Sequence, residues 1–140
     1  MTPKFKTRNA ERSTHINFLK KSEECFRAAR DSYSKGDWNA AAICSVHRGI
    51  SACDALCVYF LGKRHSGDRH GDAVALLLTI DRDDDRLISN AARLGRILGI
   101  KNMAEYEERL VYRSEAEKAL KDCERFLAFT KSKLPDLRVE

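Results

Sequence analysis

The sequence of 140 residues has only two prolines, and both lie near its ends. The stretch between Pro3 and Pro135 therefore lacks the residue that most strongly breaks helices. Long apolar runs are also missing: the longest, residues 55–61 and 73–80, fall far short of the roughly 20 residues that cross a bilayer. We therefore expect no contact with a membrane. The basic residues 1–12 are not followed by an apolar segment, so we expect no secretory signal.

Sequence patterns of several common folds and sites are absent as well. No stretch alternates β-branched and polar residues as a half-buried strand does, so we expect no sheet. The glycine-rich phosphate loop, the dinucleotide glycine fingerprint and the nucleophile elbow are also missing. The length and the 43% hydrophobic and 34% charged residues suit one globular domain. We expect a basic N-terminal arm over residues 1–12 and a single helical domain over residues 13–140.

The five cysteines do not form the pattern of a disulfide framework. Cys44, Cys53, Cys57 and Cys123 fall within apolar helical patterns, which is typical of free thiols in a reducing compartment. We therefore expect a cytoplasmic protein. Cys53 and Cys57 lie near His47 in sequence but lack the tighter spacing of tetrahedral zinc sites. We accordingly expect no metal and no cofactor.

Periodic apolar residues and capping residues predict five helices. Their expected ranges are residues 13–35, 38–61, 69–79, 86–98 and 114 to about 134. The second range is rich in Ala, Ser and Gly, which permits close packing, so we expect it at the centre. Residues 99–113 are expected to be irregular or partly extended. Long helices joined by short connections make an all-α, antiparallel (up-and-down) bundle of four to five helices.

Polar residues mark the expected helix starts. Asp37 and Asp68 can cap the second and third helices. The acidic run at residues 81–85 precedes the fourth, where carboxylates complement the positive end of the helix dipole. Ser114 and Glu117 have the spacing of a capping box for the last helix.

Positive charge is concentrated in the first quarter of the chain. The net charge is +5, and residues 1–35 hold nine Lys or Arg against four Asp or Glu. This segment is either a solvated basic helix and tail, or an electrostatic handle for RNA, DNA or an acidic partner.

The connection at residues 62–70 carries most of the candidate site residues. It contains the cations Lys63, Arg64 and Arg69 together with His65 and His70. A guanidinium can hold two phosphate oxygens, a histidine can move protons near neutral pH, and the N–H groups at a helix start face an anion. The segment is therefore either a phosphate-binding loop or an exposed polar connection.

Charged residues also interrupt the second helix. His47, Ser51 and Asp54 are spaced to share one face. A charge on an enclosed helix needs a partner, so we expect Asp54 to pair with Arg48 or with a cation of residues 62–70. Such a pair either fixes helix packing or orients a basic group of that loop.

Three stretches of the sequence resemble the HEPN superfamily of small helical-bundle proteins. They are the acid-bearing helix at residues 50–56, the segment at residues 66–70 with the apolar residues 73–77 after it, and residues 104–107 with the helix start at 114–120. Together they span most of the chain from about residue 38 onward.

The resemblance implies a function and a site. Many HEPN proteins are metal-independent endoribonucleases in which an Arg and a His a few residues later act in pairs across a homodimer. Here Arg64 and His70 are separated by five residues, and polar His65 follows the Arg directly. Arg64 would stabilise charge on the phosphate while the RNA 2′-hydroxyl attacks it, and His70 would act as acid or base. Expected supporting residues are His65, Asp54, Arg69, Arg48 and His47.

The resemblance leaves two classes of function open. The first is an endoribonuclease of toxin or defence type, a homodimer that acts on RNA and is paired with an antitoxin. The second is a non-catalytic HEPN-like module that binds a nucleotide or a protein, such as a nucleotidyltransferase partner.

Overall fold

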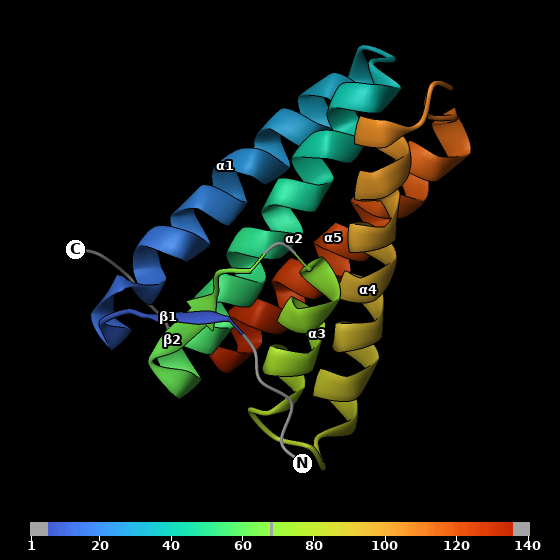
Figure 1. The fold of residues 1–140 in the computed structure, drawn as a ribbon. Helices are drawn as coiled ribbons and strands as arrows, with labels where there is room; N and C mark the ends of the chain where they lie inside the picture. Colours follow the sequence, from blue (N-terminus) through green and yellow to red (C-terminus); the bar gives the residue numbers. More distant parts are fainter. Residues whose placement is uncertain (1–5, 68, 136–140) are drawn as a thin grey trace, which may run out of the picture.

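The computed structural model describes residues 6–67 and 69–135, and the side chain of His70 is outside that description. The chain forms a bundle of five helices beside a small two-stranded sheet (Figure 1). The helices are α1 His15–Ser34, α2 Trp38–Leu61, α3 His70–Leu78, α4 Asp85–Tyr106 and α5 Arg113–Lys133. The strands are β1 Thr7–Asn9 and β2 Lys63–His65, and a 3-10 turn at Arg12–Thr14 leads into α1. The all-helical class expected from the sequence is confirmed.

Helix α2 lies at the centre and contacts the other four helices. Most of its residues are buried, and its small residues allow the close approach expected of them. A Cβ atom on Gly49 would lie 3.3 Å from side-chain atoms of both Ile97 and Leu94 on α4. The predicted range, residues 38–61, matches the observed helix.

By length and composition, α2 could also cross a membrane. Of its apolar stretch of 18 residues, 72% is buried inside the protein. The core helix of a soluble bundle has the same character, so the apolar length of α2 is accounted for by its packing against the other helices.

Glycines end the first two helices. Gly36 and Gly62 have φ values of 78° and 69°, a left-handed conformation that costs a glycine little. Asp37 stands at the start of α2, but its side chain makes no capping hydrogen bond. Asp68, expected to cap the third helix, lies outside the described residues.

The expectation of no sheet is wrong. Strand β1 pairs antiparallel with β2, and Arg8 lies opposite Arg64. Flanking hydrogen bonds from Ser66 N to Lys6 O (2.9 Å) and from Ala10 N to Gly62 O (3.0 Å) continue the pairing. Residues 7–9 of the basic arm thus pack on the connection that follows α2. Each strand has only three residues, too few for an alternating pattern to show.

The expected end of the fourth helix is also wrong. Helix α4 passes through Gly95 and Gly99 and continues to Tyr106, so residues 99–106 are helical. Ile100 and Met103 hold this last part in place, because they pack on a second apolar cluster with Ala41 and Val111. The connection to α5 therefore covers only residues 107–112.

Of the two predictions for the starts of α4 and α5, one is confirmed and the other is wrong. Asp84 caps α4 and accepts hydrogen bonds from the backbone N–H groups of Arg86 (3.0 Å) and Leu87 (3.2 Å), so the end of the acidic run lies at the positive end of the helix dipole, as expected. The predicted Ser114–Glu117 capping box is wrong. Helix α5 begins at Arg113, and Glu115 accepts the hydrogen bond from Tyr112 N at 2.9 Å.

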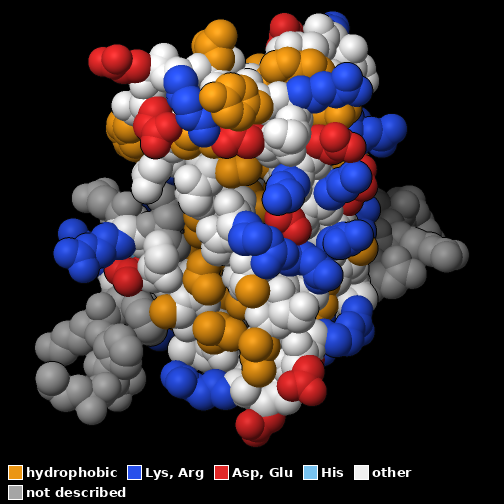
Figure 2. All heavy atoms as spheres, turned by 90° about the vertical axis from the view of Figure 1, so that its right-hand side faces the viewer, with side chains coloured by type: hydrophobic (Ala, Val, Ile, Leu, Met, Phe, Trp, Pro, Cys, Tyr) orange, Lys and Arg blue, Asp and Glu red, His pale blue; other side chains and the backbone are white. Residues whose placement is uncertain are grey.

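Basic side chains also gather outside the first 35 residues. Figure 2 shows Lys and Arg grouped over α4 and α5, beside a stripe of apolar side chains on the same face. The cationic surface is therefore not limited to the N-terminal segment that the sequence pointed to.

Candidate functional site

Three of the expected site residues meet at one cavity. Asp54 of α2 and Arg64 and His65 of β2 line a space of about 230 Å³. The other lining residues are Ile50, Cys53, Ser66, Gly67, Ala73, Leu94 and Leu98. Polar groups thus come from the end of α2 and from β2, while α3 and α4 supply apolar walls.

The backbone after α2 brings these groups together. Gly62 turns the chain out of α2 in a left-handed conformation, and pairing with β1 then holds β2 in place. Because Gly67 has no side chain, its backbone can lie close to the side chains of Lys6 and His65. A Cβ at this position would lie 3.2 Å from Lys6 Cβ and 3.3 Å from His65 Nε2. The basic arm therefore helps to shape the cavity wall.

Asp54 is an acid of the site whose pKa is strongly shifted. Its side chain is only 8% exposed. Burial raises the pKa of Asp54 to about 7, and the positive charges of Arg64 and Lys21 oppose that rise without cancelling it. None of the ion pairs among the described residues includes Asp54. The carboxyl group can therefore take up or release a proton near neutral pH.

The expected pairing of Asp54 with Arg48 is wrong. Arg48 is 2% exposed, and its guanidinium lies 3.5 Å from the ring centroid of Phe26 on α1. Its Nε and Nη1 atoms have no hydrogen-bond partner in the described part of the chain, and burial lowers the pKa of Arg48 to about 10. Residues six apart on a helix point in different directions, so Arg48 faces α1 while Asp54 faces the cavity.

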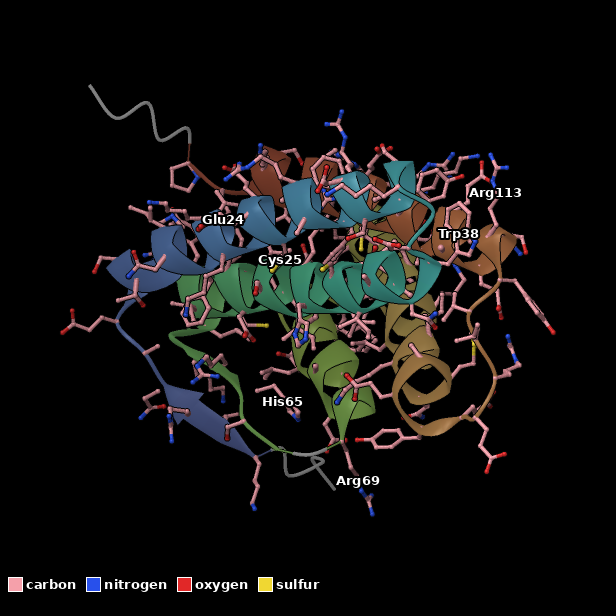
Figure 3. The ribbon with its side chains drawn as sticks, turned by 90° about the horizontal axis from the view of Figure 1, so that it is seen from above. Glu24, Cys25, Trp38, His65, Arg69 and Arg113 are labelled. Atoms are coloured by element: carbon pink, nitrogen blue, oxygen red, sulfur yellow. The ribbon has the colours of Figure 1, made fainter. Side chains whose placement is uncertain are left out.

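The remaining expected site residues lie elsewhere or are not described. His47 is exposed on α2, about two turns from Asp54, and does not line the cavity. Arg69 borders a neighbouring hollow with Gly71, Val74, Gly95 and Gly99. His70 is the first residue of α3, but its side chain lies outside the described part. Figure 3 shows His65 and Arg69 on one side of α2 and Cys25 of α1 on the other.

Two residues of α1 belong to this site although the sequence did not point to them. The Arg64 guanidinium lies 5.6 Å from the ring centroid of Phe18, and Lys21 contributes to the potential at Asp54. The periodicity of α1 placed Phe18 and Lys21 on a helix but could not show that Phe18 lies near Arg64 or that Lys21 acts on Asp54. Only the tertiary contact of α1 with α2 reveals their role.

Cys53, which also lines the cavity, is not an activated nucleophile. A hydrogen bond with Cys57 and complete burial raise the pKa of Cys53 well above its usual value. The group is therefore a neutral thiol at physiological pH, and thiolate chemistry is excluded at this position.

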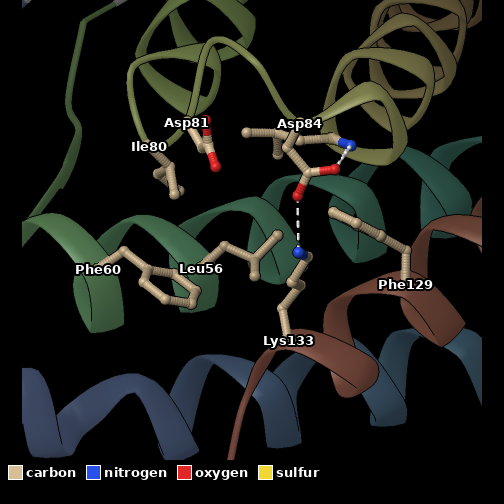
Figure 4. A pocket seen from close by; sticks show the side chains of 8 residues that line it. Leu56, Phe60, Ile80, Asp81, Asp84, Phe129 and Lys133 are labelled. Carbon is tan, nitrogen blue, oxygen red and sulfur yellow. Dashed lines mark hydrogen bonds and ion pairs between the residues drawn. The ribbon is translucent and has the colours of Figure 1, made fainter.

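A second cavity, of about 170 Å³, opens between α2, α4 and α5. Figure 4 shows its apolar lining by Leu56, Phe60 and Phe129 and the charged groups at its edge. Lys133 Nζ lies 2.6 Å from Asp84 Oδ2, and this contact with the α4 cap lowers the pKa of Asp84. The Lys133–Asp84 ion pair joins α5 to α4, so these two charged groups are explained by helix packing.

Within the described residues, no three His, Cys, Asp or Glu side chains gather as a metal site would require. Comparison with protein-family models and with curated proteins finds no match to this chain. The cavity around Asp54, Arg64 and His65 is therefore the candidate site.

Proposed function

We propose that this protein is a HEPN-like, metal-independent endoribonuclease whose site includes the cavity of Asp54, Arg64 and His65. One observation carries the proposal: an acid from α2 and a guanidinium and an imidazole from β2 line the same 230 Å³ space. A cation next to proton-transferring groups is what cleavage of a phosphodiester requires.

Each group has a role in the proposed reaction. The RNA 2′-hydroxyl loses its proton to a base and attacks the adjacent phosphorus, and the bond to the 5′-oxygen breaks as an acid protonates that oxygen. The products are a 2′,3′-cyclic phosphate and a free 5′-hydroxyl. Arg64 stabilises the charge on the phosphate oxygens, and His70 and His65 supply the acid and base. Asp54 positions Arg64, since its charge and that of Arg64 already interact.

A homodimer is part of the proposal, because the HEPN resemblance pairs Arg64 and His70 across two copies. The sequence favours helix α2, or the connection after it, as the interface of the dimer. Most residues of α2 are buried, whereas α4 has an open stripe beside the cavity. Gly95 and Gly99 have nothing within 4 Å of a Cβ position, and Ile88 on the same face is 44% exposed. Exposed glycines inside a helix cost stability, and close packing against a second helix would explain them.

The remaining parts of the proposal concern cell compartment and partners. The five free cysteines, three of them buried, are consistent with a cytoplasmic location. An endoribonuclease that acts as a toxin would need an antitoxin, which is the partner we propose.

The test of the activity uses purified protein and a mixed RNA pool in EDTA. We expect cleavage without added metal, and we expect Arg64→Ala and His70→Ala to lower the rate about a hundredfold or more. Lys63→Ala is the matched control, because it removes the adjacent cation of β2, which does not line the cavity. The control should retain most of the activity.

Two results would contradict the nuclease. If wild type leaves all RNA intact while a nucleotide titration raises its melting temperature, the protein is the non-catalytic binding module. If neither occurs, a protein partner is the better hypothesis.

The test of the dimer is light scattering on the full chain. We expect a dimer that Gly99→Arg converts to monomer, whereas Ala28→Arg on the exposed face of α1 leaves it intact. A wild-type monomer at micromolar concentration would rule out the paired site.

A further inference from the structure

An open groove between α4 and α5 gathers three arginines. Arg86 and Arg93 of α4 and Arg125 of α5 line a hollow of about 480 Å³, together with Asp85, Ser89, Asn90, Ala128 and Phe129. Arg86 and Arg93 are seven residues apart, so they are spaced about 10 Å along one face of the helix.

The charges of the groove are not neutralised. None of the ion pairs among the described residues includes Arg86, Arg93 or Arg125. Three guanidinium groups therefore face a single carboxylate, Asp85. Arg96 on the same helix shows the contrast, because it makes two hydrogen bonds to Asp122 of α5 at 3.2 and 3.1 Å.

Two of the arginines are held in place. Asn90, only 5% exposed, donates to Arg86 O at 2.8 Å and accepts from Arg93 Nη1 at 2.9 Å. Arg86 lies 5.6 Å from the ring centroid of Phe129, and its Nη2 donates to Ser132 Oγ at 3.4 Å. A nearly buried amide that orients a guanidinium toward an open groove reduces the entropy lost on binding an anion.

We propose that the α4–α5 groove binds the sugar–phosphate backbone of single-stranded RNA. The identity of this polyanion rests on the proposed function, whereas its charge follows from the groove itself. Guanidinium groups hold two phosphate oxygens at once, and their spread along two helical turns suits several phosphates of one strand. The Ser89 hydroxyl can donate a further hydrogen bond.

The shape of the groove favours RNA over an anionic membrane. The arginines line a hollow between two helices that a single strand can enter, whereas a lipid surface is flat. The groove is also separate from the cavity, because none of the described residues lines both. RNA bound here would be held to the protein at a second site.

The test measures binding of a fluorescein-labelled single-stranded RNA by anisotropy, in an Arg64→Ala background that slows cleavage. The groove variant is Arg93→Gln/Arg125→Gln. Its matched control, Lys20→Gln/Arg27→Gln, removes the same charge from exposed positions of α1. We expect the groove variant to bind at least tenfold more weakly, with a salt dependence shallower by about 1.4 in log–log slope for two lost phosphate contacts. The control should change affinity less than twofold.

Equal losses in both variants, or none in the groove variant, would overturn the proposal. The proposal would also be overturned if the groove variant lost binding to phosphatidylserine vesicles while its affinity for RNA stayed unchanged. Failure of this proposal can be distinguished from failure of the proposed nuclease activity. The protein can fail to cleave RNA and still bind it through the groove, or it can cleave RNA although the groove adds nothing to RNA binding. Circular dichroism of both variants checks that they fold.

Discussion

Asp54→Asn should reveal how much stability the buried acid costs. Below about pH 4 the carboxyl group is protonated in the folded and the unfolded chain, so it has no effect on the free energy of unfolding. Between about pH 4 and 7 the unfolded chain loses the proton while the folded chain keeps it, and stability falls as pH rises. Above pH 7 both states are ionised and the loss is constant.

The size of the effect follows from the pKa. A rise from 3.8 to about 7 corresponds to about 4 kcal/mol of lost stability at pH 8. Asparagine has nearly the same shape and no charge, so the stability of Asp54→Asn relative to wild type should increase by about that amount between pH 4 and pH 8. Urea unfolding of both proteins at a series of pH values measures this difference. Any effect of the amide on stability that does not depend on pH cancels when the values at pH 4 and pH 8 are compared.

Asp37→Asn is the matched control, because it removes an exposed carboxylate that water solvates; its difference should stay small at every pH. A wild type that gains stability from pH 4 to 8 relative to Asp54→Asn would refute the reasoning, since that result requires an ion pair at Asp54. The ion pair expected from the sequence would give the opposite sign, because removing one partner of a buried pair costs about 3 kcal/mol or more.

Two further stability predictions concern α2. Arg48→Met should raise the free energy of unfolding by up to about 3 kcal/mol at pH 7. The pKa of Arg48 is lowered to about 10, so its buried charge destabilises the folded protein at every pH below 10. If urea melts instead show that the variant is less stable by more than about 1 kcal/mol, the Arg48 charge has a stabilising partner. Gly49→Val should lower stability by about 1–3 kcal/mol, because a Cβ already lies 3.3 Å from Ile97 and Leu94. An unchanged melting temperature would mean that α2 and α4 can move apart.

The helices were largely predictable because their signals are local. The bounds of α2 follow from its small residues and from the glycines at its ends. The extension of α4 was not predictable, because Gly95 and Gly99 suggest a break when read locally. What keeps this part helical is the packing of Ile100 and Met103 against residues distant in sequence.

The candidate site was only partly predictable. The sequence indicated the chemistry of Arg64 and His65, but not that Asp54 would lie at the same cavity without a partner among the described residues. The assumed pair with Arg48 fails because six residues separate the two on the helix. Pairing of β1 with β2 brings together residues more than fifty positions apart, and strands of three residues leave no pattern to detect.

The measurement that tests the central claim most directly is mass spectrometry of the RNA ends after incubation in EDTA. The proposed site predicts products with a 2′,3′-cyclic phosphate and a 5′-hydroxyl, formed by wild type and Lys63→Ala but not by Arg64→Ala. A substrate with deoxyribose at the cut position should stay intact, because the attacking hydroxyl is missing. Cleavage of that deoxyribose substrate, or equal cleavage by Arg64→Ala, would contradict the account.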